Sequence, residues 1–126
     1  MARPNKREIT KTQIIPGARG HVIDSDYFYF GTSPQGVHDL AVVDGGHGKC
    51  TPDFDLNRSS YPTCFIIYVI RGKGTLITDS NTHHFRPDTL SGFFPGVAHH
   101  YISDPHDPLD QIFITFSGHQ VFSPGT

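Results

Sequence analysis

Histidine is the residue of this chain best suited to metal or proton chemistry, because nine of the 126 residues are histidines. Four of them form two adjacent pairs, His83-His84 and His99-His100. Both pairs fall in short runs typical of β-strands, where neighbouring side chains point to opposite faces. Neither pair can therefore hold a metal ion as a unit. We expect His84, His100 and His106 to face solvent.

Aromatic and polar side chains share strand faces in a way that predicts a ligand cavity. The period of two groups His99 with Tyr101, Gln111 with Phe113 and Thr115, and Phe65 with Ile67 and Val69. A barrel lined by these faces is half apolar and half hydrogen-bonding. Such a lining suits a neutral sugar or polyol, because a ring packs against its C–H face while planar polar groups meet its hydroxyls.

The elements that must position these side chains are β-strands. Val, Ile, Thr, Tyr and Phe make up 44 of the 126 residues, and 13 Gly and 10 Pro are spread along the whole chain. This composition favours an all-β barrel or sandwich and excludes a helical bundle. The length allows one compact domain but not two.

Short apolar runs bounded by turn residues predict eight strands. They cover residues 27–30, 38–44, 63–71, 75–78, 82–86, 90–94, 99–103 and 111–117. The run 63–71 is continuously apolar, which predicts a central strand covered on both faces. Gly45-Gly46 is expected to end the second strand, and residues 48–58 to form a loop. The spacing predicts an antiparallel jelly roll.

Charge and cysteine content restrict the classes of binding partner and the cellular compartment that we expect. The formal net charge is −2, which lacks the basic footprint of a DNA-binding domain. Two cysteines are too few for a disulfide framework, and no secretory signal or long apolar segment is evident. The sequence therefore predicts a cytoplasmic protein without membrane contact. Residues 1–20 are basic and lack apolar periodicity, which predicts a flexible N-terminal arm ahead of a domain over residues 21–126.

The order of motifs from residue 26 to residue 118 resembles the sensing domain of AraC/XylS-type transcription regulators. The most specific pieces are the segment 94–101 (FPGVAHHY) and the segment 111–118 (QIFITFSG) that follows it. The resemblance implies a cupin fold, a double-stranded β-helix or jelly-roll barrel that holds a small effector in its lumen. It also implies that DNA is bound by a separate C-terminal helix-turn-helix domain, which we expect to be absent from this chain.

The same resemblance bears on metal binding and catalysis. Cupins that bind a metal use a His-x-His, a Glu and a later His. Here only His99 matches, since Phe65 stands at the Glu position and residues 58–61 hold no histidine. We therefore expect no metal, no cofactor and no catalytic residue. The alternatives are a small metal-dependent cupin enzyme, an isomerase or dioxygenase, and a dimerisation module with a filled lumen.

Comparison with the arabinose-sensing member of the family implies which residues bind the effector. The matching positions are Arg58, Tyr101, Gln111 and Phe113, and His99 shares the face of Tyr101. Each also has a structural interpretation: Arg58 as a surface salt-bridge partner, Gln111 at a strand edge, and the two aromatic residues as core. The family's dimer contacts are usually made by helices beyond residue 118. We therefore expect this segment to self-associate weakly or not at all and the full-length regulator to dimerise.

Overall fold

The computed structural model describes residues 4–30, 41–79 and 81–117, and these residues form eleven β-strands and no helix. Residues 38–40 of the second expected strand lie outside the described residues. So do residues 118–126 of the expected domain.

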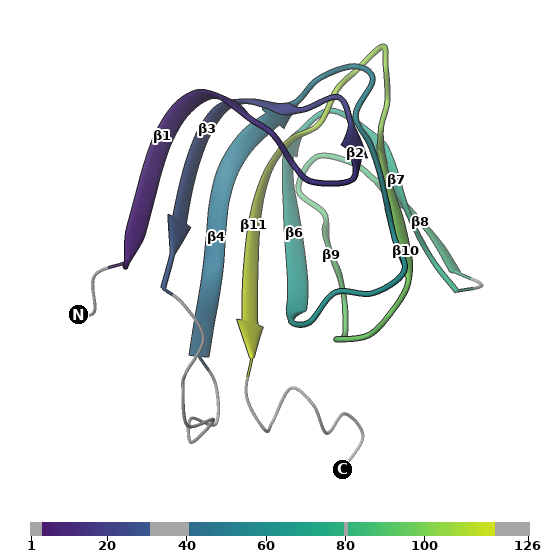
Figure 1. The fold of residues 1–126 in the computed structure, drawn as a ribbon. Helices are drawn as coiled ribbons and strands as arrows, with labels where there is room; N and C mark the ends of the chain where they lie inside the picture. Colours follow the sequence, from purple (N-terminus) through teal and green to yellow (C-terminus); the bar gives the residue numbers. More distant parts are fainter. Residues whose placement is uncertain (1–3, 31–40, 80, 118–126) are drawn as a thin grey trace.

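Two antiparallel sheets face each other (Figure 1). The six-stranded sheet has the order β1 (Lys6–Gln13), β3 (Val22–Tyr29), β4 (Ala41–Cys50), β11 (Asp110–Ser117), β6 (Cys64–Arg71), β9 (Leu90–Phe93). The five-stranded sheet has the order β2 (Ala18–Arg19), β5 (Asp55–Arg58), β10 (His99–Ser103), β7 (Gly74–Thr78), β8 (Asn81–Phe85). The sequence prediction of an all-β antiparallel jelly roll is confirmed.

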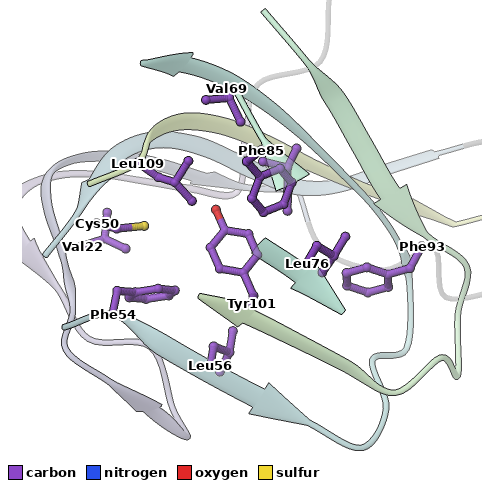
Figure 2. Packing of buried hydrophobic residues seen from close by; sticks show 11 residues of the cluster. Val22, Cys50, Phe54, Leu56, Val69, Leu76, Phe85, Phe93, Tyr101 and Leu109 are labelled. Atoms are coloured by element: carbon purple, nitrogen blue, oxygen red, sulfur yellow. The ribbon is translucent and has the colours of Figure 1, made fainter. Parts of the chain in front are cut away.

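The apolar core lies between the two sheets. Its most deeply buried side chains are Ile67, Val69, Leu76, Phe85 and Leu109, each at most 1% exposed. Strands of both sheets contribute, because alternate residues of each strand point to the inner face. Figure 2 shows how the cluster fills the space around the Tyr101 ring.

Strand β6 differs from the prediction that both of its faces are covered. Ile67 and Val69 on the inner face are fully buried, whereas Tyr68 on the outer face is 37% exposed. The strand lies between β11 and β9, one position from the edge of its sheet. The apolar run therefore reflects one core face and one half-exposed face, not burial on both sides.

Strand β4 continues through the two glycines that were expected to end it. A Cβ atom on Gly46 would lie 2.6 Å from the carbonyl oxygen of Asp26 and 3.3 Å from Cε1 of Phe113. The rings of Tyr27 and Phe113 are 6.4 Å apart, centroid to centroid, and pack across this glycine. Gly46 thus marks a close approach of neighbouring strands, which is a regular role of glycine inside a sheet.

Two segments that were expected to be irregular contain strands. The expected loop 48–58 includes the end of β4 and all of β5, and the expected arm 1–20 includes β1 and β2. Strand β1 pairs with β3, and Arg7 forms an ion pair of 2.8 Å with Asp26. Most side chains of β1 are exposed on both faces because it is an edge strand, so its sequence carries no alternation.

Within these described ranges, no helix has the length and apolar character needed to cross a membrane.

Candidate functional site

A cavity of about 170 Å³ lies between the two sheets, next to the core. Arg58, His99, Tyr101, Gln111 and Phe113, the five residues singled out in the sequence, all line it. The other lining residues are Gln13, Ile15, Pro16, Val22, Asp44, His47, Gly48, Phe54, Leu56, Tyr61, Phe65 and Phe93. An apolar cavity of about 150 Å³ holds one benzene ring, so this cavity accommodates a ligand of about one six-membered ring.

Arg58 and His99 face each other from neighbouring strands of the five-stranded sheet, where they are register partners of β5 and β10. The Nε–H group of Arg58 donates to Nε2 of His99 over 3.0 Å. On the other side of the ring, Nδ1 of His99 lies 3.0 Å from the carbonyl oxygen of Val97, which can only accept. His99 is therefore a neutral imidazole with its proton on Nδ1. Burial lowers the pKa of His99, which also favours this neutral form.

The guanidinium of Arg58 lies over the ring of Tyr61, with 4.2 Å between Cζ and the ring centroid. This is a cation–π contact. Burial lowers the pKa of Arg58, but an arginine remains charged in proteins. No carboxylate of the described residues lies within ion-pair distance of it. The structural alternative of a surface salt-bridge partner is therefore not what the structure shows.

A row of aromatic rings forms the wall of the cavity on the six-stranded sheet. Phe65 stacks on Phe93 at 5.2 Å and on Phe113 at 5.4 Å, with 6° between the ring planes in both pairs. His99 closes the row from the opposite sheet, 4.0 Å from the Phe93 ring centroid. The strands β9, β6 and β11 are adjacent, so side chains on their inner faces meet ring to ring. Because parallel rings at these distances stack face on face, the wall presents mainly apolar ring edges to the cavity.

Tyr101 lines the cavity with its ring, while its hydroxyl lies in the core. The Oη atom is enclosed, has no hydrogen-bond partner among the described residues, and points in among the core side chains (Figure 2). Burial is the largest cause that raises the pKa of this hydroxyl well above its usual value, and the Cys50 thiol beside it raises it further. The hydroxyl of Tyr101 therefore lies among the core side chains, while Arg58 lines the cavity with a charged group.

Gln111 brings an amide to the cavity from the inner face of β11. The residue is 6% exposed, and its side chain is not hydrogen-bonded to any residue that the structure describes. β11 lies between β4 and β6, so Gln111 is not at a strand edge, the structural interpretation set beside it. Its amide can donate to a ligand and accept from it.

Asp44 is a cavity residue that the sequence analysis missed. It lies on β4 and accepts hydrogen bonds from the hydroxyl of Tyr27, at 2.9 Å, and from the hydroxyl of Thr115. Arg58 approaches the cavity from the five-stranded sheet and Asp44 from the six-stranded sheet. Period-two alternation alone would have placed Asp44 and Gly46 on one face, but the expected end of the strand at Gly45-Gly46 hid that signal.

The connection between β1 and β2 supplies a further wall that was not expected. Gln13, Ile15 and Pro16 line the cavity from this segment. The Oγ–H group of Ser25 donates to Oε1 of Gln13 over 2.6 Å, which ties the end of β1 to β3. Residues from the expected arm thus take part in the candidate site.

The residues at the cavity do not fit a metal ion. Phe65 offers no ligand atom, and the Nε2 atom of His99 accepts a hydrogen bond from Arg58. In the part of the chain that the structure describes, no three His, Cys, Asp or Glu side chains converge as a transition metal requires. The guanidinium of Arg58 supplies a fixed positive charge at the histidine nitrogen that would otherwise face a metal.

Comparisons with known proteins identify the family and the fold of this chain. The sequence profile described as "AraC-like ligand binding domain" matches residues 45–123, well over half of the chain. No curated protein matches this chain.

Solved structures with a similar fold include several cupins. A cupin-like protein from Thermotoga maritima aligns with a TM-score of 0.60 and 20% identity over 91% of this chain and 80% of that one. The polyketide cyclase RemF from Streptomyces resistomycificus aligns with a TM-score of 0.59 and 17% identity over 91% and 79%. A cupin 2 conserved barrel domain protein from Salinispora arenicola aligns with a TM-score of 0.53 and 13% identity over 96% and 91%. The expected cupin-type barrel is thereby confirmed.

Proposed function

The chain belongs to the family of AraC-like ligand-binding domains, and we propose that it senses a small sugar or polyol in the cavity between its sheets and thereby controls DNA binding by a separate domain. The observation that carries the proposal is the cavity itself. It combines the apolar wall of Phe65, Phe93 and Phe113 with the polar groups of Arg58 and Gln111. An apolar lining with a few planar hydrogen-bonding groups suits a small sugar, whose C–H groups meet the rings and whose hydroxyls meet the polar groups.

We propose a role in sensing without catalysis, in the cytoplasm where a regulator meets DNA. The same fold supports catalysis in other proteins, as the polyketide cyclase among its structural neighbours illustrates. A nucleophile at this site would need an activating base or a lowered pKa. Cys50 is not among the cavity-lining residues, and burial raises the pKa of its thiol to about 12. Arg58 and His99 are engaged with each other.

The test is a thermal-shift screen of the purified domain against a panel of monosaccharides, their carboxylic acids and polyols. A ligand at 100 times its Kd adds about 2.7 kcal/mol to the free energy of unfolding. For a domain of this size the melting temperature rises by roughly 5 to 15 °C.

We take the sugar that raises the melting temperature most in this screen. Arg58→Ala should weaken its binding by roughly ten- to a hundred-fold, because the substitution removes a charge-assisted hydrogen bond. Arg86→Ala is the matched control, since Arg86 is exposed and does not line the cavity. If no member of the panel shifts the melting temperature, or if Arg58→Ala binds as the wild type does, the cavity is not the effector site.

A further inference from the structure

The positive charge of Arg58 has no acidic partner in the described part of the chain. Its guanidinium lies between the ring of Tyr61, at 4.2 Å, and the neutral nitrogen of His99, at 3.0 Å. A half-buried cation loses hydration, and neither of these neutral contacts returns the full electrostatic attraction of an anion. Asp44 acts on Arg58 only from beyond ion-pair distance, so an anionic ligand at the Arg58 end of the cavity would compensate this charge.

The hydrogen-bond donors that remain on Arg58 match a carboxylate. Its Nε–H group is used by His99, and the side chain of Tyr61 also contacts the guanidinium. Among the described residues no carboxylate lies within ion-pair distance of the Nη1 and Nη2 atoms. These two atoms carry four N–H groups in one plane, which can donate two parallel hydrogen bonds to a carboxylate. The bond to His99 also fixes the orientation of the fork before the ligand arrives.

Asp44 gives the cavity a second and opposite pole. Its carboxylate lines the cavity from the six-stranded sheet and is held by the hydroxyls of Tyr27 and Thr115. Each carboxylate oxygen has further lone pairs, so Asp44 can accept from a ligand hydroxyl. An acidic group is repelled there by the like charge. A ligand with one acidic end and several hydroxyls is therefore oriented with the acid at Arg58 and a hydroxyl at Asp44.

We propose that the effector is a sugar acid of monosaccharide size, whose carboxylate binds the Nη atoms of Arg58 and whose hydroxyls reach Asp44 and Gln111. This inference rests on the proposed function and specifies its ligand. It departs from the neutral sugar that the sequence suggested, because the sequence does not show that Arg58 lacks an acidic partner. The volume of about 170 Å³ limits the ligand to one ring, or to an open chain of similar size.

The experiment compares sugars with their own carboxylates by titration calorimetry. The pairs are galactose with galacturonate, glucose with glucuronate, and arabinose with arabinonate. Within each pair the skeleton is kept and one terminal carbon is oxidised to the acid. For at least one pair, we expect the acid to bind roughly ten- to a hundred-fold more tightly than the neutral sugar.

Three variants assign this preference to the fork of Arg58. Arg58→Gln should abolish the preference while the neutral sugar still binds. Arg58→Lys should keep part of it, because the charge stays while the planar fork is lost. Arg86→Gln, at an exposed arginine away from the cavity, should leave the preference unchanged.

The possible failures are distinguishable. If the neutral sugars bind as tightly as the acids or more tightly, the sugar-acid inference is wrong and the proposed sugar-sensing function stands. The inference is also wrong if Arg58→Gln retains the preference for the acid. If neither member of any pair binds, the proposed function itself fails.

Discussion

The two ring nitrogens of His99 have different partners, and this makes the residue sensitive to acid. Nδ1 donates to the carbonyl oxygen of Val97, and Nε2 accepts from Arg58. A second proton on the ring would have to sit on Nε2, where it would break the bond to Arg58 and place two positive charges together. Burial and the charge of Arg58 both lower the pKa of His99.

His99 should therefore make the domain less stable as the pH falls. In the unfolded chain a histidine titrates near pH 6.5, whereas in the folded protein its pKa is lower. Between these two values the unfolded state binds more protons, so the free energy of unfolding decreases as the pH falls through about 6.5. Urea unfolding at about pH 7.5 and about pH 5 should show a smaller loss of stability in His99→Gln than in the wild type.

His84→Gln is the control for this measurement, because His84 is exposed on β8. It should keep the wild-type loss of stability. An equal loss in the wild type and in His99→Gln would show that the proton uptake on unfolding comes from other residues.

Among the strands, β4 depends most on the absence of a side chain. At Gly46 any Cβ atom would meet the backbone of β3 and the ring of Phe113. Gly46→Ala should destabilise the domain by about 1 to 3 kcal/mol, because the neighbouring strand or ring must shift to make room. Urea unfolding monitored by circular dichroism measures this loss.

Lys49→Ala is the control in the same strand, because Lys49 is exposed and forms only a surface ion pair of 3.8 Å with Asp24. Its effect should stay within about 0.5 kcal/mol. Wild-type stability in Gly46→Ala would mean that the close approach at this position is not required.

Elements with an apolar run or clear alternation could be predicted from the sequence. Strands β6, β9, β10 and β11 lie within one residue of their predicted bounds because Gly, Pro or Asp residues stop each run. Strands β1 and β5 could not be predicted. The first is an edge strand with two exposed faces, and the second has only Leu56 buried among four residues.

Some residues of the candidate site could be predicted from the sequence, and others could not. Alternation along one strand was enough to put Gln111 and Phe113 on one face, and both line the cavity. Tyr61 and Ile15 line it too, but their places depend on how the second sheet and the β1–β2 connection pack. That Tyr101 points its hydroxyl into the core likewise depends on packing, not on the period of the strand.

For the whole molecule, the outer face of the six-stranded sheet bears on self-association. Leu90, Tyr68 and Ile112 lie side by side in register on β9, β6 and β11, and they are 66%, 37% and 44% exposed. The row does not extend further, because Ile112 is followed on β4 and β3 by His47 and Asp26. Both of these have charged partners, Asp110 and Arg7. Val42 on β4, in register with Phe116, is a further exposed apolar residue of this sheet at 37%. Single exposed apolar side chains and short rows of them are ordinary for a monomer.

We therefore expect the domain to sediment as a monomer at micromolar concentration. Sedimentation velocity over a range of concentrations is the measurement. A tight dimer that Leu90→Glu dissociates would contradict this expectation and would identify the row as an interface. A matched substitution on the five-stranded sheet, His84→Glu, should leave the sedimentation coefficient unchanged, because it lies away from the row.

The reactivity of the two buried thiols with a reagent reports transient opening of the domain. Cys50 and Cys64 are free and only 3% and 7% exposed. Burial raises the pKa of both, that of Cys50 to about 12, so a thiol reagent reacts only with molecules that have transiently opened. Cys50 lies beside Tyr101, whose ring lines the cavity. In a Cys64→Ser variant, the labelling rate of Cys50 should therefore report openings beside the cavity, and a ligand bound in the cavity should slow that rate.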